Sequence, residues 1–194
     1  HYAALNNTGY PNIKIKNNLK AATYFNHFIS ANRFLSEKLQ KILGTKVNTI
    51  HLGMPTEYIN NLHKVPKLKI ENTIAVAFGS SASAHTFLNQ IDVFERILNA
   101  NPLRRLVVLG DINLPKNSIS CDDQLILIPR LNYLEYIQAL TKIEKIVVLQ
   151  GQKITDLAKS RVKPLEANIL GLECFATRLP DYEDALNSGL EMQF

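Results

Sequence analysis

The sequence predicts an α/β domain over residues 72–194, built as a doubly wound parallel sheet with helices on both faces. Short apolar runs that read AVAF, LVVL, LILI and IVVL recur along this part of the chain, and segments with helical spacing separate them. Strands that alternate with helices indicate βαβ units and a parallel sheet. The runs also lack strict apolar–polar alternation, as expected for strands buried on both faces.

Each element of this domain follows from a local pattern. The expected strands span residues 73–78, 105–109, 124–128, 145–149 and 173–176, and residues 190–194 are expected to begin one more. The expected helices span residues 85–99, 131–140, 164–170 and 181–187. Gly171 and Gly189 follow the last two helices, where a residue without a Cβ can end a helix.

Residues 1–52 predict only part of a second domain. A short apolar run at 27–31 and the run VNTIHL at 47–52 are expected strands. Between them, the apolar spacing predicts a helix that Ser30 or Asn32 caps and that ends at Gly44. A further helix is expected from Asn17 or Asn18. This strand–helix–strand unit is too small for a core of its own, and residues 53–71, with Pro55 and Pro66, are interpreted as a linker.

Length and composition indicate an ordinary globular protein. The 194 residues suit one domain and part of another, with 46% hydrophobic and 20% charged residues. The sequence contains neither an apolar run of the roughly 20 residues that cross a bilayer nor a signal-peptide pattern at its start. Cys121 and Cys174 match no metal or redox spacing, so two thiols in a reducing compartment are the simpler interpretation. The sequence therefore favours the cytoplasm.

The positive charge lies in the first third of the chain. Residues 1–70 carry a net charge of +8 and residues 71–194 a net charge of −3. Dispersed lysines of this kind usually form a solvated face, which is the favoured interpretation. Peripheral contact of this basic part with the inner face of a membrane is the alternative. The aromatic-interleaved basic stripe and the helix-turn-helix of nucleic-acid-binding proteins are not found, so we expect no nucleic-acid partner.

Candidate ligand contacts follow the carboxyl ends of the strands, where such sheets bind ligands. They are the loop 79–83 (GSSAS) with Gly79 and Ser80, the pair at 110–111, Arg130, and the loop 150–163. His85 is expected at the start of the helix after the first loop, where it could equally be a surface residue. The first loop matches neither a dinucleotide fingerprint nor a P-loop, and no metal-ligand spacing occurs around His85.

The segment KSRVKPLE at residues 159–166 is the most informative of these places. Pro164 suits the first position of a helix, with Lys163 just outside it and Glu166 in the first turn. Lys159, Arg161 and Lys163 then crowd the positive end of the helix, which suits a diphosphate, while a carboxylate could accept hydrogen bonds from ribose. The competing interpretation is an ordinary helix start in which the acid complements the helix dipole. Local physics alone favours that second interpretation.

Several short motifs resemble the family 4 type of GT-B glycosyltransferases. The block KSRVKPLEA with Gly171 is similar to a KSxxKxLEAxxxG pattern, and FGS followed by His85 is similar to the start of the C-terminal domain. Weaker matches are FISANRFLSEKLQKILGTKVNTI at 28–50, HLGM at 51–54, and YED at 182–184 with Gly189. The resemblance implies a Rossmann-like C-terminal domain at 72–194, preceded by the end of the N-terminal, acceptor-side domain at 1–52.

The resemblance also implies an activity. It is the transfer of a sugar from a nucleotide-diphosphate donor to a saccharide or lipid-linked acceptor in polysaccharide biosynthesis, with retention of configuration and without metal or cofactor. Glu166 would contact the donor ribose, and Lys159, Ser160 and the Gly79–Ser80 loop would face the phosphates or the sugar.

The sequence departs from the family pattern at two positions. Ala158 stands where the first acid of the family's acidic pair is expected, and Leu88 stands where an acid often follows the histidine. The catalytic residues stay unassigned, and we expect this chain to be inactive alone. The alternatives are a non-catalytic partner subunit of the same fold that binds a nucleotide or sugar, which Ala158 favours, and an epimerase of GT-B architecture.

Overall fold

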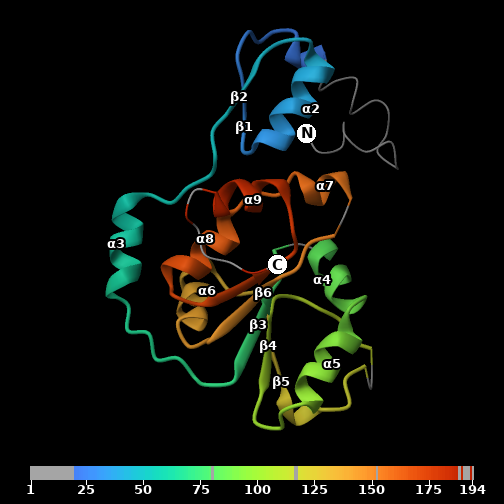
Figure 1. Ribbon diagram of the computed structural model, residues 1–194, viewed down its shortest axis with the longest axis vertical. Helices are drawn as coiled ribbons and strands as arrows, with labels where there is room; N and C mark the ends of the chain where they lie inside the picture. The colour runs from blue at the N-terminus through green and yellow to red at the C-terminus, as the bar shows by residue number, and fades with distance from the viewer. Residues whose placement is uncertain are drawn as a thin grey trace. The chain divides into compact units, whose positions relative to one another are not determined.

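A computed structural model of the chain describes residues 20–79, 81–115, 118–151, 153–187, 189 and 193. The chain divides into two compact units (Figure 1). The first unit comprises His1–Gly53, Gln152–Val162 and Arg178–Gly189, and the second comprises Met54–Gly151, Lys163–Thr177 and Leu190–Phe194. The domain boundaries expected from the sequence stay a prediction.

The second unit contains a five-stranded parallel sheet in the order β5-β4-β3-β6-β7. The predicted doubly wound α/β fold is thereby confirmed. Each of these strands lies within the range expected from the apolar runs or matches it. The strands are β3 (Thr73–Ala77), β4 (Arg105–Leu109), β5 (Leu125–Ile128), β6 (Lys145–Val148) and β7 (Glu173–Ala176).

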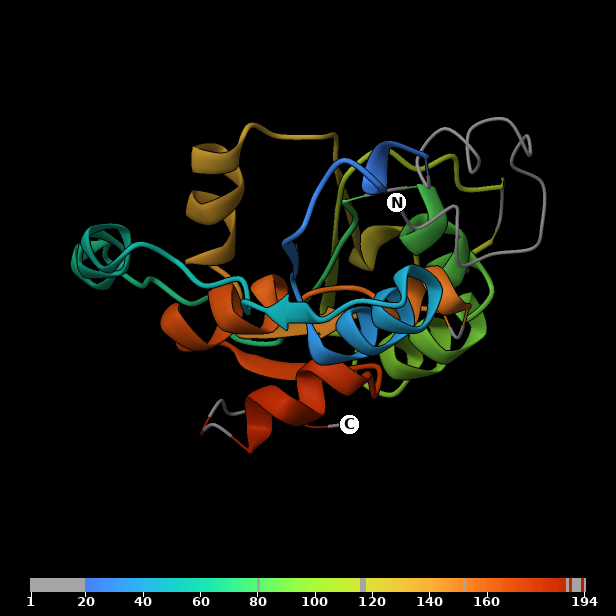
Figure 2. The same ribbon diagram turned by 90° about the horizontal axis from the view of Figure 1, so that it is seen from above.

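Helices cover both faces of this sheet. Figures 1 and 2 show α4 (Ser81–Leu88) and α5 (Ile91–Asn99) on one side of the strands, and α6 (Tyr133–Leu140) and α8 (Val162–Ile169) on the other. This division follows from the strand order, because right-handed crossovers to opposite sides of β3 place their helices on opposite faces. Asn132 and Glu135 form a capping box at the start of α6.

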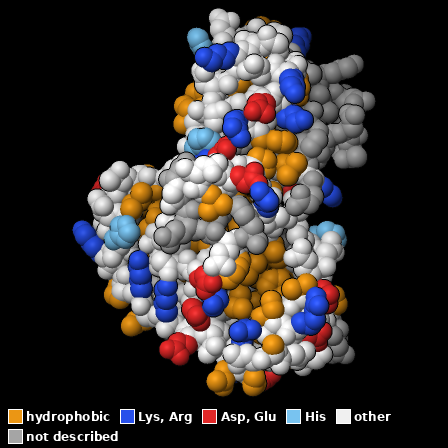
Figure 3. Space-filling view, viewed as in Figure 1, with side chains coloured by type: hydrophobic (Ala, Val, Ile, Leu, Met, Phe, Trp, Pro, Cys, Tyr) orange, Lys and Arg blue, Asp and Glu red, His pale blue; other side chains and the backbone are white. Residues whose placement is uncertain are grey.

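A buried hydrophobic cluster packs between β3, β4 and the helices α4 and α5. Phe87 is fully buried, and its ring centroid lies 5.4 Å from that of Phe78 and 5.0 Å from that of Phe94. On the edge strand β5, by contrast, Ile126 and Leu127 are exposed, and Figure 3 shows hydrophobic side chains on this part of the second unit. The core on this face is therefore closed around α4 and α5 and open at the edge strand.

Two helices replace the single helix predicted over residues 85–99. The amide of Gln90 donates to the carbonyl of Phe87 at 2.9 Å, and a turn at Asn89 and Gln90 separates α4 from α5. Helical spacing could not reveal this break, because Phe87, Ile91 and Phe94 all pack into the same core on either side of the turn.

The segment interpreted as a linker contains a helix, α3 (Thr56–Lys64). The expected loop 150–163 likewise contains the short α7 (Ile154–Leu157). At the end of the chain, Gln193 forms a parallel bridge to Phe175, and most of the strand predicted at 190–194 lies outside the described residues. So does the start of the helix expected from Asn17 or Asn18.

The first unit contains the predicted strand–helix–strand element. β1 (Phe28–Ser30) pairs in parallel with β2 (Val47–Thr49), and α2 (Arg33–Leu43) connects them. Asn32 caps α2 by accepting the amide of Leu35 at 2.8 Å, and Gly44 ends the helix with φ +66°. The same unit includes α7 and α9 (Pro180–Leu186). Asn32, which has no exposed surface, donates to the carbonyl of Ala158 at 2.9 Å, so this cap also holds the strand–helix–strand element to the residues that follow α7.

Among the helices of the described ranges, none combines the length and the apolar composition that a bilayer crossing requires.

Candidate functional site

The strand order of the second unit contains one reversal of direction, between β3 and β6. From β3 the chain proceeds to β4 and β5 on one side, and it then returns to β6 and β7 on the other. The loops that leave the carboxyl ends of β3 and β6 therefore diverge, and in open α/β sheets ligands bind in the crevice that such loops leave. The site is best sought at the carboxyl end of β3.

Lys163 brings a positive charge to this place. Its amine donates a hydrogen bond to the carbonyl of Ala77, the last residue of β3. Its Cε lies 4.0 Å from the point that a Cβ on Gly79 would occupy. The structure therefore brings together two predicted site residues, Lys163 from α8 and Gly79 from the loop after β3, while Ser80 lies outside the described residues.

The start of α8 differs from the prediction. The helix begins at Val162, so Pro164 is its third residue and not its first, and Lys163 lies inside the helix. Glu166 is the fifth residue and therefore lies beyond the first turn. Proline is tolerated at this third position because the first N–H groups of a helix need no intrahelical partner. Lys163 and Glu166 are three residues apart and share one face of the helix.

Glu166 is buried, and each of its two carboxylate oxygens accepts a hydrogen bond. Only 4% of the surface of this residue is exposed. Oε1 accepts the hydroxyl of Tyr133 at 2.9 Å, and Oε2 accepts that of Tyr136 at 3.2 Å. Both tyrosines lie on α6, three residues apart. Sequence reasoning missed them, although their spacing placed two hydroxyls on one helix face.

Burial controls the ionisation of this cluster. Burial raises the pKa of Glu166, and the hydroxyls of Tyr133 and Tyr136 and the charge of Lys163 only partly offset it. Burial, followed by the charge of Glu166, also raises the pKa of Tyr136 well above its ordinary value. The pKa of Tyr133 is raised in the same direction. Both tyrosines therefore stay protonated at neutral pH and act as donors to the carboxylate.

A Glu166→Gln variant is expected to lose a pH dependence of stability. The pKa of Glu166 is higher in the folded protein than in the unfolded chain, so the protonated acid stabilises the fold. This stabilisation is complete below the unfolded pKa, about 4.3, and it is lost as the pH rises through the native pKa. The melting temperature of the variant minus that of the wild type should therefore increase from about pH 4 to about pH 7. Thermal melts followed by circular dichroism measure this difference. A difference that stays constant, or that decreases with pH, would contradict the burial of a charged carboxylate.

Tyr58 of α3 extends the aromatic cluster. Its ring stacks on that of Tyr133, with centroids 5.7 Å apart and an interplanar angle of 27°. The hydroxyl of Tyr58 is buried and has no hydrogen-bond partner of ordinary geometry within the described part of the chain. The helix that the sequence did not predict thus contributes a ring stacked on Tyr133 and a buried hydroxyl.

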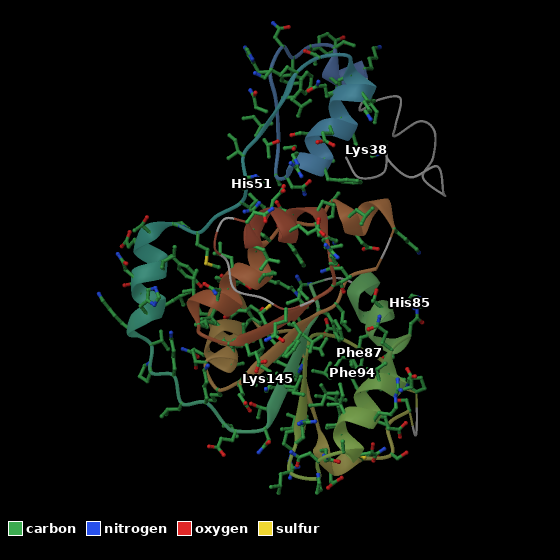
Figure 4. The ribbon with its side chains drawn as sticks, in the orientation of Figure 1. Lys38, His51, His85, Phe87, Phe94 and Lys145 are labelled. Atoms are coloured by element: carbon green, nitrogen blue, oxygen red, sulfur yellow. The ribbon has the colours of Figure 1, made fainter. Side chains whose placement is uncertain are left out.

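The remaining predicted contacts of the second unit lie in exposed positions. His85 is the fifth residue of α4 and not its first, and it is exposed (Figure 4). Arg130 is also exposed, and its backbone amide donates to Asp111 Oδ1 at 3.1 Å. Neither residue makes a described contact with Glu166, and their proposed ligand contacts stay predictions.

Lys159 and Ser160 belong to the first unit and are partly buried there. The carbonyl of Lys159 accepts from the amide side chain of Asn32 at 3.4 Å. Arg161, predicted beside the diphosphate, pairs instead with Asp181: its Nη2 lies 2.8 Å from Oδ1, and its backbone amide donates to Oδ2 at 2.7 Å. The guanidinium of Arg161 thus forms its ion pair inside the first unit, because the carboxylate of Asp181 has no exposed surface and needs a counter-charge.

His51 lies against this ion pair (Figure 4). Its Nδ1 is 2.9 Å from Asp181 Oδ1 and 2.8 Å from Arg161 Nη2. His51, Asp181 and Asp184 place one ligand atom each within 4.8 Å of one another, as three metal ligands might be placed. The guanidinium of Arg161 already holds the positive charge among them, so the cluster carries no metal assignment.

The structure also shows the surroundings of Ala158, where the family pattern led us to expect an acid. Ala158 is completely buried in the first unit. Asp156, two residues earlier, is buried as well, and its carboxylate accepts the backbone amide of Lys153 at 3.3 Å at the start of α7. This nearby acid thus has a local structural contact.

Comparisons with known proteins support the fold. No protein-family model matches the chain, and no curated protein matches it in sequence. Among solved structures, TarM has a TM-score of 0.59 and 14% identity over 90% of this chain and 34% of its own. WaaG, described as a glycosyltransferase involved in lipopolysaccharide biosynthesis, has a TM-score of 0.59 and 12% identity over 85% of this chain and 48% of its own.

A third structure is the pneumococcal O-GlcNAc transferase GtfA in complex with UDP and GlcNAc. It has a TM-score of 0.57 and 14% identity, and the match covers 91% of this chain and 35% of GtfA. The chain thus spans between about a third and a half of these structures. It has the α/β fold that they share, and the predicted resemblance to GT-B glycosyltransferases is confirmed at the level of the fold.

Proposed function

We propose that the second unit is the donor-binding domain of a glycosyltransferase, which moves a sugar from a nucleotide diphosphate to a saccharide or lipid-linked acceptor. The observation that carries the proposal is the placement of α8. One helix face presents Lys163 to the carboxyl end of β3 and buries Glu166 next to it. A cation and a hydrogen-bond acceptor at the reversal point of the sheet suit a diphosphate joined to a ribose.

In this proposal different residues contact different parts of the nucleotide. Lys163 and the backbone after β3, at Gly79, offset the charge of the diphosphate. Glu166 accepts hydrogen bonds from the ribose hydroxyls. A diphosphate leaving group gains negative charge as the glycosidic bond breaks, so fixed cations and N–H groups near it lower the barrier without a metal.

The acceptor and the catalytic groups belong to the rest of such an enzyme, and retention of configuration is part of the proposal. So are a role in polysaccharide biosynthesis, a cytoplasmic location and a peripheral contact of the basic first third with the membrane. Lys41 in the last turn of α2 and Lys46 after the helix are exposed, which is compatible with that contact.

Calorimetric titration of the 194-residue chain with UDP, ADP and GDP tests the proposal. UDP is the first probe, because the GtfA structure is described with UDP. Glu166→Ala should weaken the binding by about 1–3 kcal/mol, since the ribose hydroxyls lose their buried acceptor.

The matched control is Glu37→Ala, a change at a side chain that is 65% exposed on α2. It should leave the dissociation constant unchanged. If no nucleoside diphosphate binds at about 1 mM, or if Glu166→Ala binds as well as the wild type, the donor-binding assignment is wrong.

A further inference from the structure

The carboxylate oxygens of Glu166 that the proposed ribose would contact already accept hydrogen bonds within the protein. Both carboxylate oxygens of Glu166 accept phenolic hydroxyls, one from Tyr133 and one from Tyr136. A carboxylate has additional lone pairs, but this one is 4% exposed, so access to them is restricted. A ligand hydroxyl therefore has to replace one of the two tyrosine hydroxyls.

The two tyrosines differ in how easily a ligand can displace their hydroxyls from Glu166. Tyr136 lies one turn inside α6 and is largely covered, so its displacement would disturb the packing of the helix. Tyr133 is the first residue of α6 and is 46% exposed. Its side chain can swing toward solvent by a rotation about χ1 without disturbing the helix. Tyr133 is therefore the hydroxyl that a ligand can exchange.

The surroundings of Tyr133 also suit a polar ligand. The stacked ring of Tyr58 borders it, and the buried hydroxyl of Tyr58 has no partner of ordinary geometry among the described residues. An unsatisfied buried hydroxyl costs free energy that a ligand hydroxyl nearby can recover. One oxygen of Glu166 can then accept a hydrogen bond from one ligand hydroxyl. The hydroxyl of Tyr58 can donate to, or accept from, a neighbouring ligand hydroxyl.

We infer that Tyr133 is a gate on Glu166: its hydroxyl mimics a ribose hydroxyl in the free protein and is displaced when a ligand with vicinal hydroxyls binds. This inference rests on the proposed function, since the ribose of a nucleoside diphosphate is the ligand. It adds that the free site is closed by its own side chain. The affinity for the nucleotide is then reduced by the free energy of the Tyr133–Glu166 hydrogen bond.

The gate predicts that Tyr133→Phe binds UDP more tightly than the wild type. Phenylalanine keeps the ring and its stacking on Tyr58 but removes the competing hydroxyl. We expect a dissociation constant about three- to ten-fold lower, the range given by the net loss of one typical intramolecular hydrogen bond. Tyr24→Phe is the matched control, because Tyr24 is 75% exposed and belongs to the first unit. It should leave the dissociation constant unchanged.

A second ligand separates the gate from a general effect on the site. 2′,3′-Dideoxyuridine diphosphate lacks the vicinal hydroxyls and need not displace Tyr133. Tyr133→Phe should therefore bind it with the same affinity as the wild type. The chain contains no tryptophan, so tyrosine fluorescence gives an independent signal. UDP should change the tyrosine emission of the wild type by releasing Tyr133 from a carboxylate, and it should change that of Tyr133→Phe less.

The outcomes distinguish the two proposals. Tighter binding of UDP by Tyr133→Phe together with unchanged binding of the dideoxy analogue supports the gate. Equal or weaker binding of UDP by Tyr133→Phe, in a protein with a wild-type circular dichroism spectrum, overturns the gate and leaves the proposed function standing. Failure of the wild type, Tyr133→Phe and Tyr24→Phe to bind any of UDP, ADP and GDP overturns the proposed function and the gate with it.

Discussion

Replacement of Asp181 by asparagine is expected to destabilise the protein by about 3–5 kcal/mol, because it removes one partner of a buried ion pair. The side chain of Asp181 has no exposed surface, and that of Arg161 is 11% exposed. The carboxylate accepts three hydrogen bonds from Arg161: from the backbone amide at 2.7 Å, from Nη2 at 2.8 Å and from Nε at 3.3 Å. Asparagine leaves the guanidinium buried without its counter-charge.

Urea denaturation followed by circular dichroism measures this loss. The matched control is Asp92→Asn, since Asp92 also pairs with an arginine, at 3.8 Å, but its side chain is 74% exposed. The control should cost no more than about 0.5 kcal/mol, as is usual for an exposed pair one helical turn apart. Equal urea midpoints for Asp181→Asn and the wild type would show that the ion pair contributes nothing to the folded state.

A double variant, Arg161→Met with Asp181→Asn, refines this result. Removal of both charges abolishes the unpaired buried cation, so part of the lost stability should return. The return cannot be complete, because the backbone amide of Arg161 donates at 2.7 Å to an oxygen of Asp181, and the side-chain amide of asparagine offers it a weaker acceptor.

The features that the sequence predicted well are those that neighbouring residues determine. Asn32 caps α2 and Gly44 ends it, because a side-chain acceptor and a residue without a Cβ act on the adjacent helix end. Gly171 with φ +67° ends α8 for the same reason. The strands of the second unit were predicted because each is a short apolar run, although β5 at the edge of the sheet stays partly exposed.

The features that the sequence could not predict depend on contacts between distant segments. Glu166 was identified, but its partners Tyr133 and Tyr136 lie 33 and 30 residues away. Arg161 and Lys163 are two residues apart in one basic run, yet their side chains serve different partners. One pairs with Asp181 and the other reaches the carbonyl of Ala77. Charge and spacing show that cations are present, and only the folded backbone determines which partner each of them contacts.

The break between α4 and α5 illustrates the same limit within a short segment. Apolar residues at 87, 91, 94 and 98 fit one continuous helix, and the two shorter helices keep them in the same core. Glycine and proline, the residues that usually interrupt helices, are both missing from residues 85–99. The turn at Asn89 and Gln90 is therefore determined by how the two helices pack against the sheet and not by a local signal.

Phe87→Ala is expected to cost about 3–5 kcal/mol, the second of the two largest effects. The side chain of Phe87 is fully buried, and its ring packs against that of Phe78 and against that of Phe94, which Figure 4 shows beside it. Alanine leaves a cavity that the fixed backbones of β3 and α5 cannot fill by a small movement. Phe87→Leu, which retains most of the buried volume, should lose substantially less stability.

Phe87→Ala also tests whether the aromatic core supports the proposed site. Phe87 lies on α4, the helix that follows the loop at Gly79, and Phe78 precedes that loop directly. A weakened Phe78–Phe87 contact should therefore reduce the affinity for UDP in whatever fraction remains folded, whereas Leu103→Ala should not. Leu103 is 70% exposed, and its change should also leave the urea midpoint within about 0.5 kcal/mol of the wild type. A loss of stability without any loss of affinity would show that the loop after β3 is held independently of the aromatic core.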